Sequence, residues 1–394
     1  MNFDILREVA EFRGQLSSDK RRLAFFFGAG TSQAVGIPGL LALTDLVRNE
    51  LHNSEAEHFA RFLTEDGPGG NVETVLNRVR LCREILGDTE TRRVEGLSGL
   101  EAAALDRGIC QAIRKHVTIN PPGGLRRHFI FAHWLKTITR SFPLELFTTN
   151  YDLLFETAME SAETPYFDGF VGTVSPFFRA TSIDTDFGGV PLPTVPRDWV
   201  RLWKLHGSIN WLSIRDPLTG SSRIVRRSDR TVDPATELMV YPSRQKYSDS
   251  RRLPFTAYQD RLRRLLASGE TLLVIVGYSF ADEHLNEIIF QSLRSNPRLA
   301  VTALSFAPLD SVPTRQNLMQ PTDGIPSLTI YAPDGAVIGG TLGGWTPPAE
   351  KPPSGLASWP FWDETKKICT LPDFNGFVDF LRSFLASRSI PELS

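Results

Sequence analysis

The sequence predicts an α/β protein with a mainly parallel sheet that one long helical stretch interrupts. Two apolar runs, Leu23–Phe27 and Leu272–Val276, have the composition of strands that are buried on both faces. Amphipathic helical patterns alternate with such runs, which is typical of a parallel sheet. Between residues 54 and 140 strand patterns are nearly missing and helical patterns recur. We therefore expect a sheet domain over residues 1–50 and 141–394 and a helical insertion over residues 51–140.

Helical periodicity accounts for most of the chain outside the sheet. In the first helix Ile5, Val9 and Phe12 recur at the spacing of one helix face. Clusters of Gly and Pro at 67–70 and 120–124 separate helices of the insertion. The expected helices cover residues 3–16, 40–47, 55–64, 71–86, 97–117, 125–138, 153–158, 258–266, 285–293 and 374–384. The expected strands cover residues 23–27, 144–148, 202–205, 238–241, 272–276, 299–305 and 327–331, with loops and short strands over 160–200.

The composition is that of an ordinary globular chain of 394 residues, with 41% hydrophobic and 22% charged residues. Forty-three Lys and Arg against 45 Asp and Glu leave a net charge of −2, which argues against nucleic-acid binding. Cys82, Cys110 and Cys369 lie far apart and form no C-x-x-C pair, so we expect neither a cysteine zinc site nor a disulfide framework. Without a signal-like N-terminus or an apolar run of about 18 residues, we expect a cytoplasmic protein that spans no membrane.

A glycine-rich turn follows the first strand. Residues 28–32 read Gly-Ala-Gly-Thr-Ser, and glycine lets the backbone turn tightly and lets a ligand approach the main chain. Thr31 and Ser32 are good capping residues, so we expect a helix to begin here with free N–H groups that suit a phosphate. The same pattern also arises as an ordinary βα turn, and Gln33 breaks the dinucleotide pattern G-x-G-x-x-G.

Three further polar clusters follow expected strands. They are residues 149–152 (Thr-Asn-Tyr-Asp), 206–208 (His-Gly-Ser) and 277–282 (Gly-Tyr-Ser-Phe-Ala-Asp). The carboxyl ends of parallel strands share one edge of a sheet, and ligands of open α/β sheets bind at that edge. The four clusters together therefore predict one ligand site.

Each cluster also has a purely structural interpretation. Asn150 would cap a helix, and Asp152 would stabilise its first turn. His206, beside a glycine, would be a hydrogen-bonded core histidine, and Ser279 and Asp282 would be a turn and a helix cap. A solvated loop would account for the basic segment with Arg223, Arg226, Arg227 and Arg230. A purely structural interpretation is adequate for each cluster alone, but it is much less convincing for four clusters in this order.

In combination these motifs resemble the sirtuin family. The resemblance rests on residues 28–32, 36–38 (Gly-Ile-Pro), 148–152 and 205–208. Residues 277–284, Gly-Tyr-Ser-Phe-Ala-Asp-Glu-His, are similar to the sirtuin-like branch found in bacterial anti-phage defence. The resemblance implies a Rossmann-like sheet that binds NAD and a site that breaks the nicotinamide–ribose bond.

The chain departs from the pattern of sirtuin deacylases in three places. Gly39-Leu40-Leu41 stands where deacylases have Asp-Phe-Arg, and Thr149 stands where they have Gln. Three dispersed cysteines cannot form the four-cysteine zinc module of the deacylases, and the helical insertion would take over its part in folding. We therefore expect NAD+ as a substrate and no zinc, and we favour NAD+ cleavage over protein deacylation.

The resemblance also implies roles for individual residues. Asn150 would contact the ribose and orient a water molecule. His206 would accept a proton from a ribose hydroxyl or from water, since imidazole titrates near cytoplasmic pH, at about 6.5. Ile37 and Asp152 would hold the carboxamide of nicotinamide. The remaining candidates would bind the phosphates and the adenosine ribose: Gly28, Ala29, Gly30, Thr31, Ser32, Gly277, Tyr278 and Ser279.

These roles favour an NAD+ glycohydrolase that releases nicotinamide and ADP-ribose and depletes NAD in anti-phage defence by abortive infection. The size and layout resemble the sirtuin-like subunit of two-gene systems, which implies a HerA-type ATPase partner and a homo-oligomer. Two alternatives stay open: a non-catalytic NAD- or ADP-ribose-binding subunit, and an NAD-dependent deacylase or ADP-ribosyl transferase. A nucleic-acid enzyme is more distant, since no metal-binding carboxylate cluster stands out.

Overall fold

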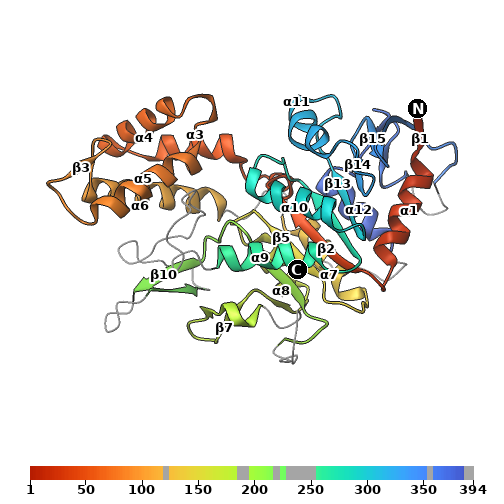
Figure 1. Cartoon of the computed structure of the whole chain (residues 1–394), viewed down its shortest axis with the longest axis horizontal. Helices are drawn as coiled ribbons and strands as arrows, with labels where there is room; N and C mark the ends of the chain where they lie inside the picture. Colours follow the sequence, from red (N-terminus) through yellow and green to blue (C-terminus); the bar gives the residue numbers. More distant parts are fainter. Residues whose placement is uncertain (119–123, 184–194, 216–221, 228–253, 353–357, 386–394) are drawn as a thin grey trace.

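The computed structural model describes residues 1–118, 124–183, 195–215, 222–227, 254–352 and 358–385 (Figure 1). The strand expected at 238–241 and Arg230 lie outside these residues. Within the described residues the main sheet has ten strands: β1 (Asn2–Asp4), β2 (Arg22–Phe27), β5 (Glu145–Thr148), β6 (Tyr166–Phe167), β9 (Val200–Lys204), β12 (Thr271–Val276), β13 (Leu299–Leu304), β14 (Leu328–Tyr331), β15 (Gly335–Ile338) and β16 (Thr341–Thr346). The expected α/β class is confirmed.

The strand order places a switch point at the centre of this sheet. The order is β1-β16-β15-β14-β13-β12-β2-β5-β9-β6, and all pairs from β14 to β6 are parallel. From β2 the chain adds β5 and β9 on one side and later returns to add β12, β13 and β14 on the other side. The carboxyl ends of β2 and β12 therefore flank the point where the strand order reverses, which is where open α/β sheets bind ligands.

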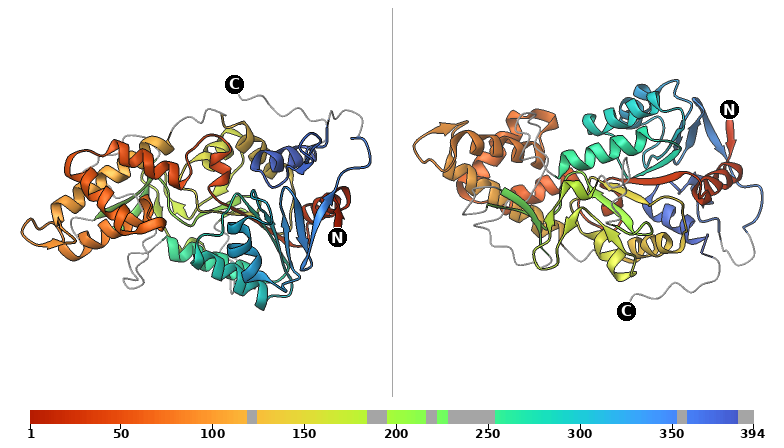
Figure 2. Two further views of the ribbon diagram at one scale, coloured as in Figure 1. Left: turned by 90° about the horizontal axis from the view of Figure 1, so that it is seen from above. Right: turned by 60° about the horizontal axis from the view of Figure 1, so that its bottom comes forward.

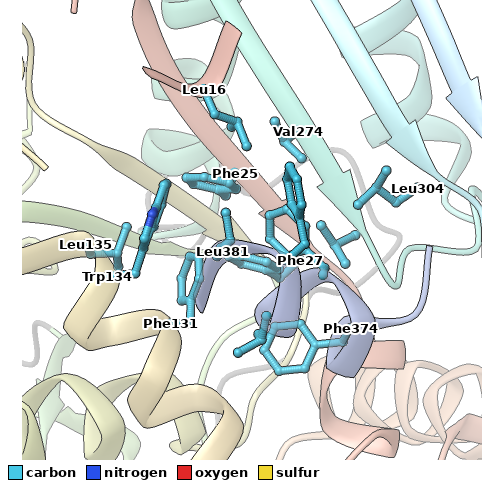
Figure 3. Close-up of a cluster of buried hydrophobic side chains, with 14 of the residues drawn as sticks. Leu16, Phe25, Phe27, Phe131, Trp134, Leu135, Val274, Leu304, Phe374 and Leu381 are labelled. Carbon is cyan, nitrogen blue, oxygen red and sulfur yellow. The ribbon is translucent and has the colours of Figure 1, made fainter. Parts of the chain in front are cut away.

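Both faces of β2 are buried, as its apolar run predicted. Side chains alternate between the faces of a strand, so Phe25 and Phe27 join one core and Ala24 and Phe26 join the other. On the first face, helices α1 (Ile5–Ser17), α7 (Arg126–Thr137), α8 (Leu154–Ser161) and α12 (Phe374–Arg382) contribute to the core. Figure 3 shows Phe25 and Phe27 of this core beside Trp134 of α7 and Phe374 of α12.

Two long helices cover the second face of the sheet. They are α9 (Phe255–Ala267) and α10 (Glu283–Ser295), and they include the helices predicted over residues 258–266 and 285–293. Leu262 of α9 and Leu285 of α10 are fully buried, and they belong to the same core as Ile275 of β12. The sheet is thus a layer between two helical layers, the arrangement expected for parallel strands.

Four helices form a separate cluster with its own core: α3 (Leu40–Glu50), α4 (Asn53–Glu65), α5 (Val72–Leu86) and α6 (Gly99–Val117). Figures 1 and 2 show these orange helices at the end of the molecule away from β1. Capping boxes at Asn71 and Ser98 begin α5 and α6. A short hairpin of β3 (Arg93–Val94) and β4 (Leu97–Ser98) joins them. The next helix, α7, packs on the sheet instead, and the boundaries of the insertion at 51 and 140 stay a prediction.

The sheet extends further than the sequence predicted. Residues 2–4, expected next to or inside the first helix, pair with β16 more than 330 positions away, and β15 and β16 continue the sheet beyond β14. The strand β1 is short and its partner is distant, so it leaves little local signal. In contrast, β15 and β16 form a local hairpin across Gly339 and Gly340, which the sequence analysis missed.

The smaller elements complete the fold. A second sheet has the order β10 (Trp211–Arg215), β11 (Ser222–Arg226), β8 (Phe177–Phe178), β7 (Phe170–Val171), and β17 (Trp362–Asp363) pairs with β18 (Ile368–Cys369). The short helical pieces are α2 (Gly30–Gln33), α11 (Val312–Thr314), η1 (Gly67–Gly69), η2 (Ala180–Ser182), η4 (Arg315–Met319) and η5 (Gln320–Thr322). Among the helices described, none has both the length and the apolar character of a membrane span.

Candidate functional site

A cavity of about 1840 Å³ lies at the carboxyl edge of the sheet, next to the ends of β2, β5, β9 and β12. Small-molecule sites have volumes of roughly 300–1,000 Å³, so this cavity has room for a dinucleotide. Most of the predicted site residues line it: Ala29, Gly30, Ser32, Ile37, Asn150, Asp152, His206, Gly277, Tyr278 and Ser279. Gly28 and Thr31 are not among its lining residues, and both are buried. The four polar clusters of the sequence therefore meet at one place, as predicted.

Ser32, Asn150 and Asp152 form a buried hydrogen-bonded network in the wall of this cavity. The Ser32 hydroxyl donates to Asp152 Oδ2 at 2.5 Å, and Asn150 Nδ2 donates to Ser32 Oγ at 2.7 Å. Asp152 Oδ1 accepts the N–H of Leu154 at 3.0 Å, at the start of α8. Each of the three residues is at most 7% exposed. The network ties the turn after β2 to the turn after β5, and Asp152 also has the helix-stabilising role that its structural interpretation gave it.

The orientation of the Asn150 amide follows from its partners. Besides Ser32, its Nδ2 donates to Gly28 O at 3.1 Å and to Thr31 Oγ1 at 2.9 Å. A main-chain carbonyl oxygen can only accept, so the contact with Gly28 identifies the amide nitrogen. No described residue donates to Asn150 Oδ1. The amide therefore presents one unused acceptor in a residue that lines the cavity.

The glycines beside the cavity are explained by contact between two turns. The N–H of Gly30 donates to Gly277 O at 2.9 Å, and a Cβ on Gly28 would lie 2.5 Å from that same oxygen. Gly277 has φ +66°, and a Cβ there would lie 2.8 Å from Thr31 N. The main chains after β2 and β12 thus touch directly, which only glycine permits. The sequence assigned the close approach to a ligand, whereas the structure shows an approach between two parts of the same chain.

The helix predicted after the first turn is α2, which has only four residues, and Ala29 is its N-cap. The prediction that Thr31 and Ser32 cap it is wrong, because both lie inside its single turn and no side chain caps it. The N–H groups of residues 28 and 30–32 all donate to main-chain carbonyl oxygens. The prediction that these N–H groups are free to bind a phosphate is therefore wrong. Ala29 is exposed, and its N–H has no acceptor within the described part of the chain.

His206 lies in the turn after β9 and contacts a carboxylate from the turn after β12. Its Nε2 is 3.0 Å from Asp282 Oδ2, 76 positions later in the chain. In the sheet, β9 and β12 are separated by β2 and β5. The side chain of His206 is 15% exposed and that of Asp282 is 29% exposed.

Asp282 also caps α10, as the sequence predicted, since its Oδ1 accepts the N–H groups of His284 at 3.0 Å and Leu285 at 3.1 Å. Burial raises the pKa of Asp282, but its hydrogen bond and charge interaction with His206 and the two cap hydrogen bonds outweigh burial and leave the pKa lowered. Asp282 is therefore ionised at neutral pH. Sequence reasoning predicted Asp282 as a helix cap and missed its contact with His206, because that contact depends on how two distant turns meet.

A buried lysine supports the same edge of the sheet. Lys204 is the last residue of β9, and its Nζ donates to Asp152 O, to Glu156 Oε1 at 2.8 Å and to Ser208 Oγ at 2.9 Å. Its side chain is only 2% exposed. Burial raises the pKa of Glu156 more than the neighbouring ammonium lowers it. Sequence reasoning missed Lys204, whose one signal is a charged residue between the apolar residues Trp203 and Leu205, two positions before His206.

Three other predicted residues, Tyr278, Ser279 and Ile37, also line the cavity. The Tyr278 hydroxyl donates to Asn286 Oδ1 at 3.0 Å and to Asp282 O at 3.3 Å. Ser279 is exposed, and Ile37 is 6% exposed in the core of the helical cluster. These positions place Ser279 and Ile37 on different elements of the cavity wall, the first after β12 and the second before α3.

The helical cluster adds charged residues to the cavity wall. Asp106 of α6 is fully buried and accepts from Arg80 Nη2 at 3.1 Å and from Arg83 Nη1 at 2.5 Å. Burial raises the pKa of Asp106, but the two guanidinium groups lower it below its ordinary value. The sequence pattern gave no sign of this cluster, because the three residues lie on two different helices.

The basic segment is only partly a solvated loop. Arg226 forms an ion pair with Asp168, whose side chain is 8% exposed, so the loop interpretation is wrong for this residue. Burial raises the pKa of Asp168 more than Arg226 lowers it. Arg223 is exposed, as expected.

The described residues contain no group of three or more His, Cys, Asp or Glu side chains that could hold a metal ion. Cys82, Cys110 and Cys369 are free thiols, and burial raises the pKa of Cys369 to about 12. The expectation that the protein needs no zinc stays a prediction.

Comparison with known families matches the segment that holds most of this site. Residues 144–322 match a SIR2-like domain. The match begins at the strand before Asn150 and includes His206, Ser279 and Asp282. It covers less than half of the chain and does not include the turn after β2, which the network of Ser32, Asn150 and Asp152 joins to it.

Similar solved structures are distant from this chain. A Sir2 mutant with a deacetylated peptide and 3′-O-acetyl ADP ribose is 13% identical, with a TM-score of 0.37, over 78% of this chain and 90% of that chain. A Sir2 homologue–NAD complex is 15% identical, with a TM-score of 0.35, over 84% of this chain and 90% of that chain. No curated protein matches the chain.

Proposed function

We propose that this chain is an NAD+ glycohydrolase, which cleaves the nicotinamide–ribose bond to give nicotinamide and ADP-ribose. The observation that carries the proposal is that Asn150 and His206 line the same large cavity at the carboxyl edge of the sheet. Both residues belong to the segment that matches a SIR2-like domain. One offers an unused amide oxygen and the other an imidazole, which are the groups that water activation needs.

The reaction itself demands little of the protein at the leaving group. The pyridinium nitrogen of nicotinamide takes the electron pair of the breaking bond to ribose C1′ and departs as a neutral molecule. Positive charge then develops on the ribose, as in other glycoside cleavages. The oxygen of a water molecule bonds to C1′, and His206 accepts the proton that this water releases. Asn150 Oδ1 accepts a hydrogen bond from the water or a ribose hydroxyl and so holds the reacting groups in place.

The buried network supports this geometry from behind. Asn150 Nδ2 has three acceptors, Gly28 O, Thr31 Oγ1 and Ser32 Oγ, so the amide cannot rotate without losing them. Preorganised polar groups of this kind need no rearrangement during the reaction. We assign Gly28 and Thr31 this supporting role.

The remaining predicted residues are proposed to bind the substrate. Each carboxylate oxygen of Asp152 accepts one hydrogen bond from the described residues and keeps further acceptor capacity for the carboxamide N–H₂ group, which Ile37 would cover. Ala29 and Ser279 are exposed on the two turns that meet at the switch point, where we place the diphosphate. Gly30 and Gly277 keep these turns together, and Tyr278 shapes the wall beside them.

The cellular role rests on the resemblance alone. We propose that NAD loss serves anti-phage defence by abortive infection in the cytoplasm, in a homo-oligomer that a HerA-type ATPase controls. A non-catalytic NAD- or ADP-ribose-binding subunit is the alternative. Pure binding would not need both Asn150 and His206 at the cavity, which favours the enzyme. Protein deacylation stays less favoured, since the zinc module of the deacylases has no cysteine counterpart here.

Nicotinamide release from NAD+ by the purified protein tests the proposal. We expect release by the wild type and a loss of at least about 100-fold in Asn150→Ala. Asn296→Ala is the matched control, because Asn296 is also 7% exposed and donates to two main-chain carbonyls, Leu266 O and Gly269 O, away from the cavity. NAD+ that binds without any release of nicotinamide would favour the binding subunit, and turnover of an acyl-lysine peptide would favour the deacylase.

A further inference from the structure

We propose that Asp282 is the positioning residue for His206, in addition to its role as the N-cap of α10. The carboxylate fixes the imidazole ring with Nε2 as the hydrogen-bond donor and leaves Nδ1 as the nitrogen that accepts a proton. The effect on turnover rests on the proposed NAD+ cleavage, whereas the hydrogen bond itself does not.

One carboxylate performs both tasks with different oxygens. Oδ1 accepts the N–H groups of His284 and Leu285 at the start of α10, and Oδ2 lies 3.0 Å from His206 Nε2. The helix cap therefore fixes the rotation of the carboxylate and directs its second oxygen to the histidine. A group held in this way can orient a second side chain without losing freedom of its own during the reaction.

The main chain around Asp282 is held by two further hydrogen bonds. The Tyr278 hydroxyl donates to Asp282 O at 3.3 Å, and Asn286 Nδ2 donates to Phe280 O at 2.8 Å. Phe280 has φ +53°, a left-handed conformation that a bulky residue rarely adopts. Phe280 is 6% exposed and the centroid of its ring lies 4.8 Å from that of Tyr278, so packing holds the residue in this conformation. Strained residues persist only where the surroundings fix them, and they concentrate at functional sites.

The tautomer of His206 follows from the partner. An ionised carboxylate can only accept a hydrogen bond, and the carboxyl group of Asp282 stays ionised at neutral pH. The imidazole must therefore carry its proton on Nε2, which leaves the lone pair of a neutral ring on Nδ1. As Nδ1 takes the proton released by the attacking water, the adjacent negative charge stabilises the imidazolium ion that forms.

Substitutions of Asp282 can separate positioning from capping. Asn and Ser are about as good as Asp at a helix N-cap, so Asp282→Asn and Asp282→Ser keep α10 while removing the charged acceptor. We expect both variants to lose about 10- to 100-fold in kcat for nicotinamide release, with KM for NAD+ little changed. Asp4→Asn is the matched control, since Asp4 caps α1 through Leu6 N at 2.9 Å and is exposed. It should keep wild-type kcat and KM.

A second readout does not depend on turnover. In ¹⁵N-histidine-labelled protein, His206, assigned by comparison with His206→Gln, should show a downfield and slowly exchanging Nε2–H proton. This signal should vanish in Asp282→Ser and persist in Asp4→Asn, which a purely structural role for Asp282 would not produce. Thermal unfolding of each variant shows that the fold is kept.

The two readouts keep the two proposals apart. A wild type that shows the Nε2–H signal but releases no nicotinamide would contradict the NAD+ cleavage and leave the positioning of His206 supported. Wild-type kcat in both folded Asp282 variants would overturn the positioning role. The same conclusion would follow if His206 carried its proton on Nδ1 in the wild type.

Discussion

His206 and His128 lie in two regions of the molecule that treat the same side chain in opposite ways. His206 lies at the carboxyl edge of the sheet, lines the cavity and contacts the carboxylate of Asp282. His128 lies on α7 in the aromatic core, is fully buried, and has its ring 4.7 Å from that of Phe374 and 5.0 Å from that of Phe155. Neither nitrogen of His128 has a hydrogen-bond partner among the described residues.

The comparison shows that surroundings decide what a histidine can do. Burial lowers the pKa of His128 to about 4, although the charge of Asp152 acts in the opposite direction. A ring that stays neutral throughout the physiological range acts in the core as an aromatic group. His206 keeps a charged partner and access to the cavity, which are the two conditions for proton transfer.

The largest expected difference between the two regions is in turnover. His206→Ala should reduce nicotinamide release at least about 100-fold, because the proton acceptor is lost. His128→Leu should keep release within about twofold of the wild type, since Leu has a similar volume and the ring takes no part in the reaction. Steady-state rates of both purified variants test this. A comparable loss in a folded His128→Leu protein would break the distinction.

The free energy of unfolding should depend on pH through His128. The pKa of His128 in the folded state, about 4, lies below the roughly 6.5 of an unfolded chain, so between these values the unfolded chain binds a proton that the folded chain does not. The free energy of unfolding should therefore fall by about 3 kcal/mol from this residue as pH drops from 6.5 to 4.

His128→Leu should lack this component of the pH dependence. Urea unfolding at pH 7 and at pH 4.5 measures it in both proteins. Equal losses of stability in the wild type and in His128→Leu would show that the pKa of His128 is the same in the folded and unfolded chains.

A smaller effect should distinguish the turn contact beside the cavity from an ordinary glycine turn. Gly277→Ala should lower the free energy of unfolding by about 2–3 kcal/mol, because its Cβ would meet Thr31 N at 2.8 Å in addition to the cost of φ +66°. Gly269→Ala, at φ +63° with no atom within 4 Å of the added Cβ, should cost only about 1 kcal/mol. Denaturant unfolding compares them, and equal losses would show that the contact between turns adds nothing.

The parts of the fold that could be predicted are those with local signals. The buried runs of β2 and β12 and the periodicity of α5 and α6 are visible in any short window of the sequence. At the sheet edge, β1 could not be predicted because it has three residues and pairs with a strand more than 330 positions away. The hairpin of β15 and β16 had a local signal, the pair Gly339-Gly340, and was missed.

The candidate site could be predicted in its location more than in its contacts. Asn150 and His206 were expected at one sheet edge because both follow parallel strands, and both line the cavity. The close contact that requires glycine at positions 28, 30 and 277 was not predictable. It depends on two turns that touch in space, although residues 30 and 277 are 247 positions apart in the sequence. The same holds for Lys204 and for the contact between His206 and Asp282.

NAD+ cleavage at His206 is tested directly by comparing NAD+ loss and nicotinamide release by wild-type protein and His206→Ala under identical conditions. We expect the wild type to form nicotinamide in amounts equal to the NAD+ lost. We also expect a folded His206→Ala protein to be at least about 100-fold slower. Equal rates for the two proteins would contradict the proposal, because the edge of the sheet that holds His206 would then not be where NAD+ is cleaved.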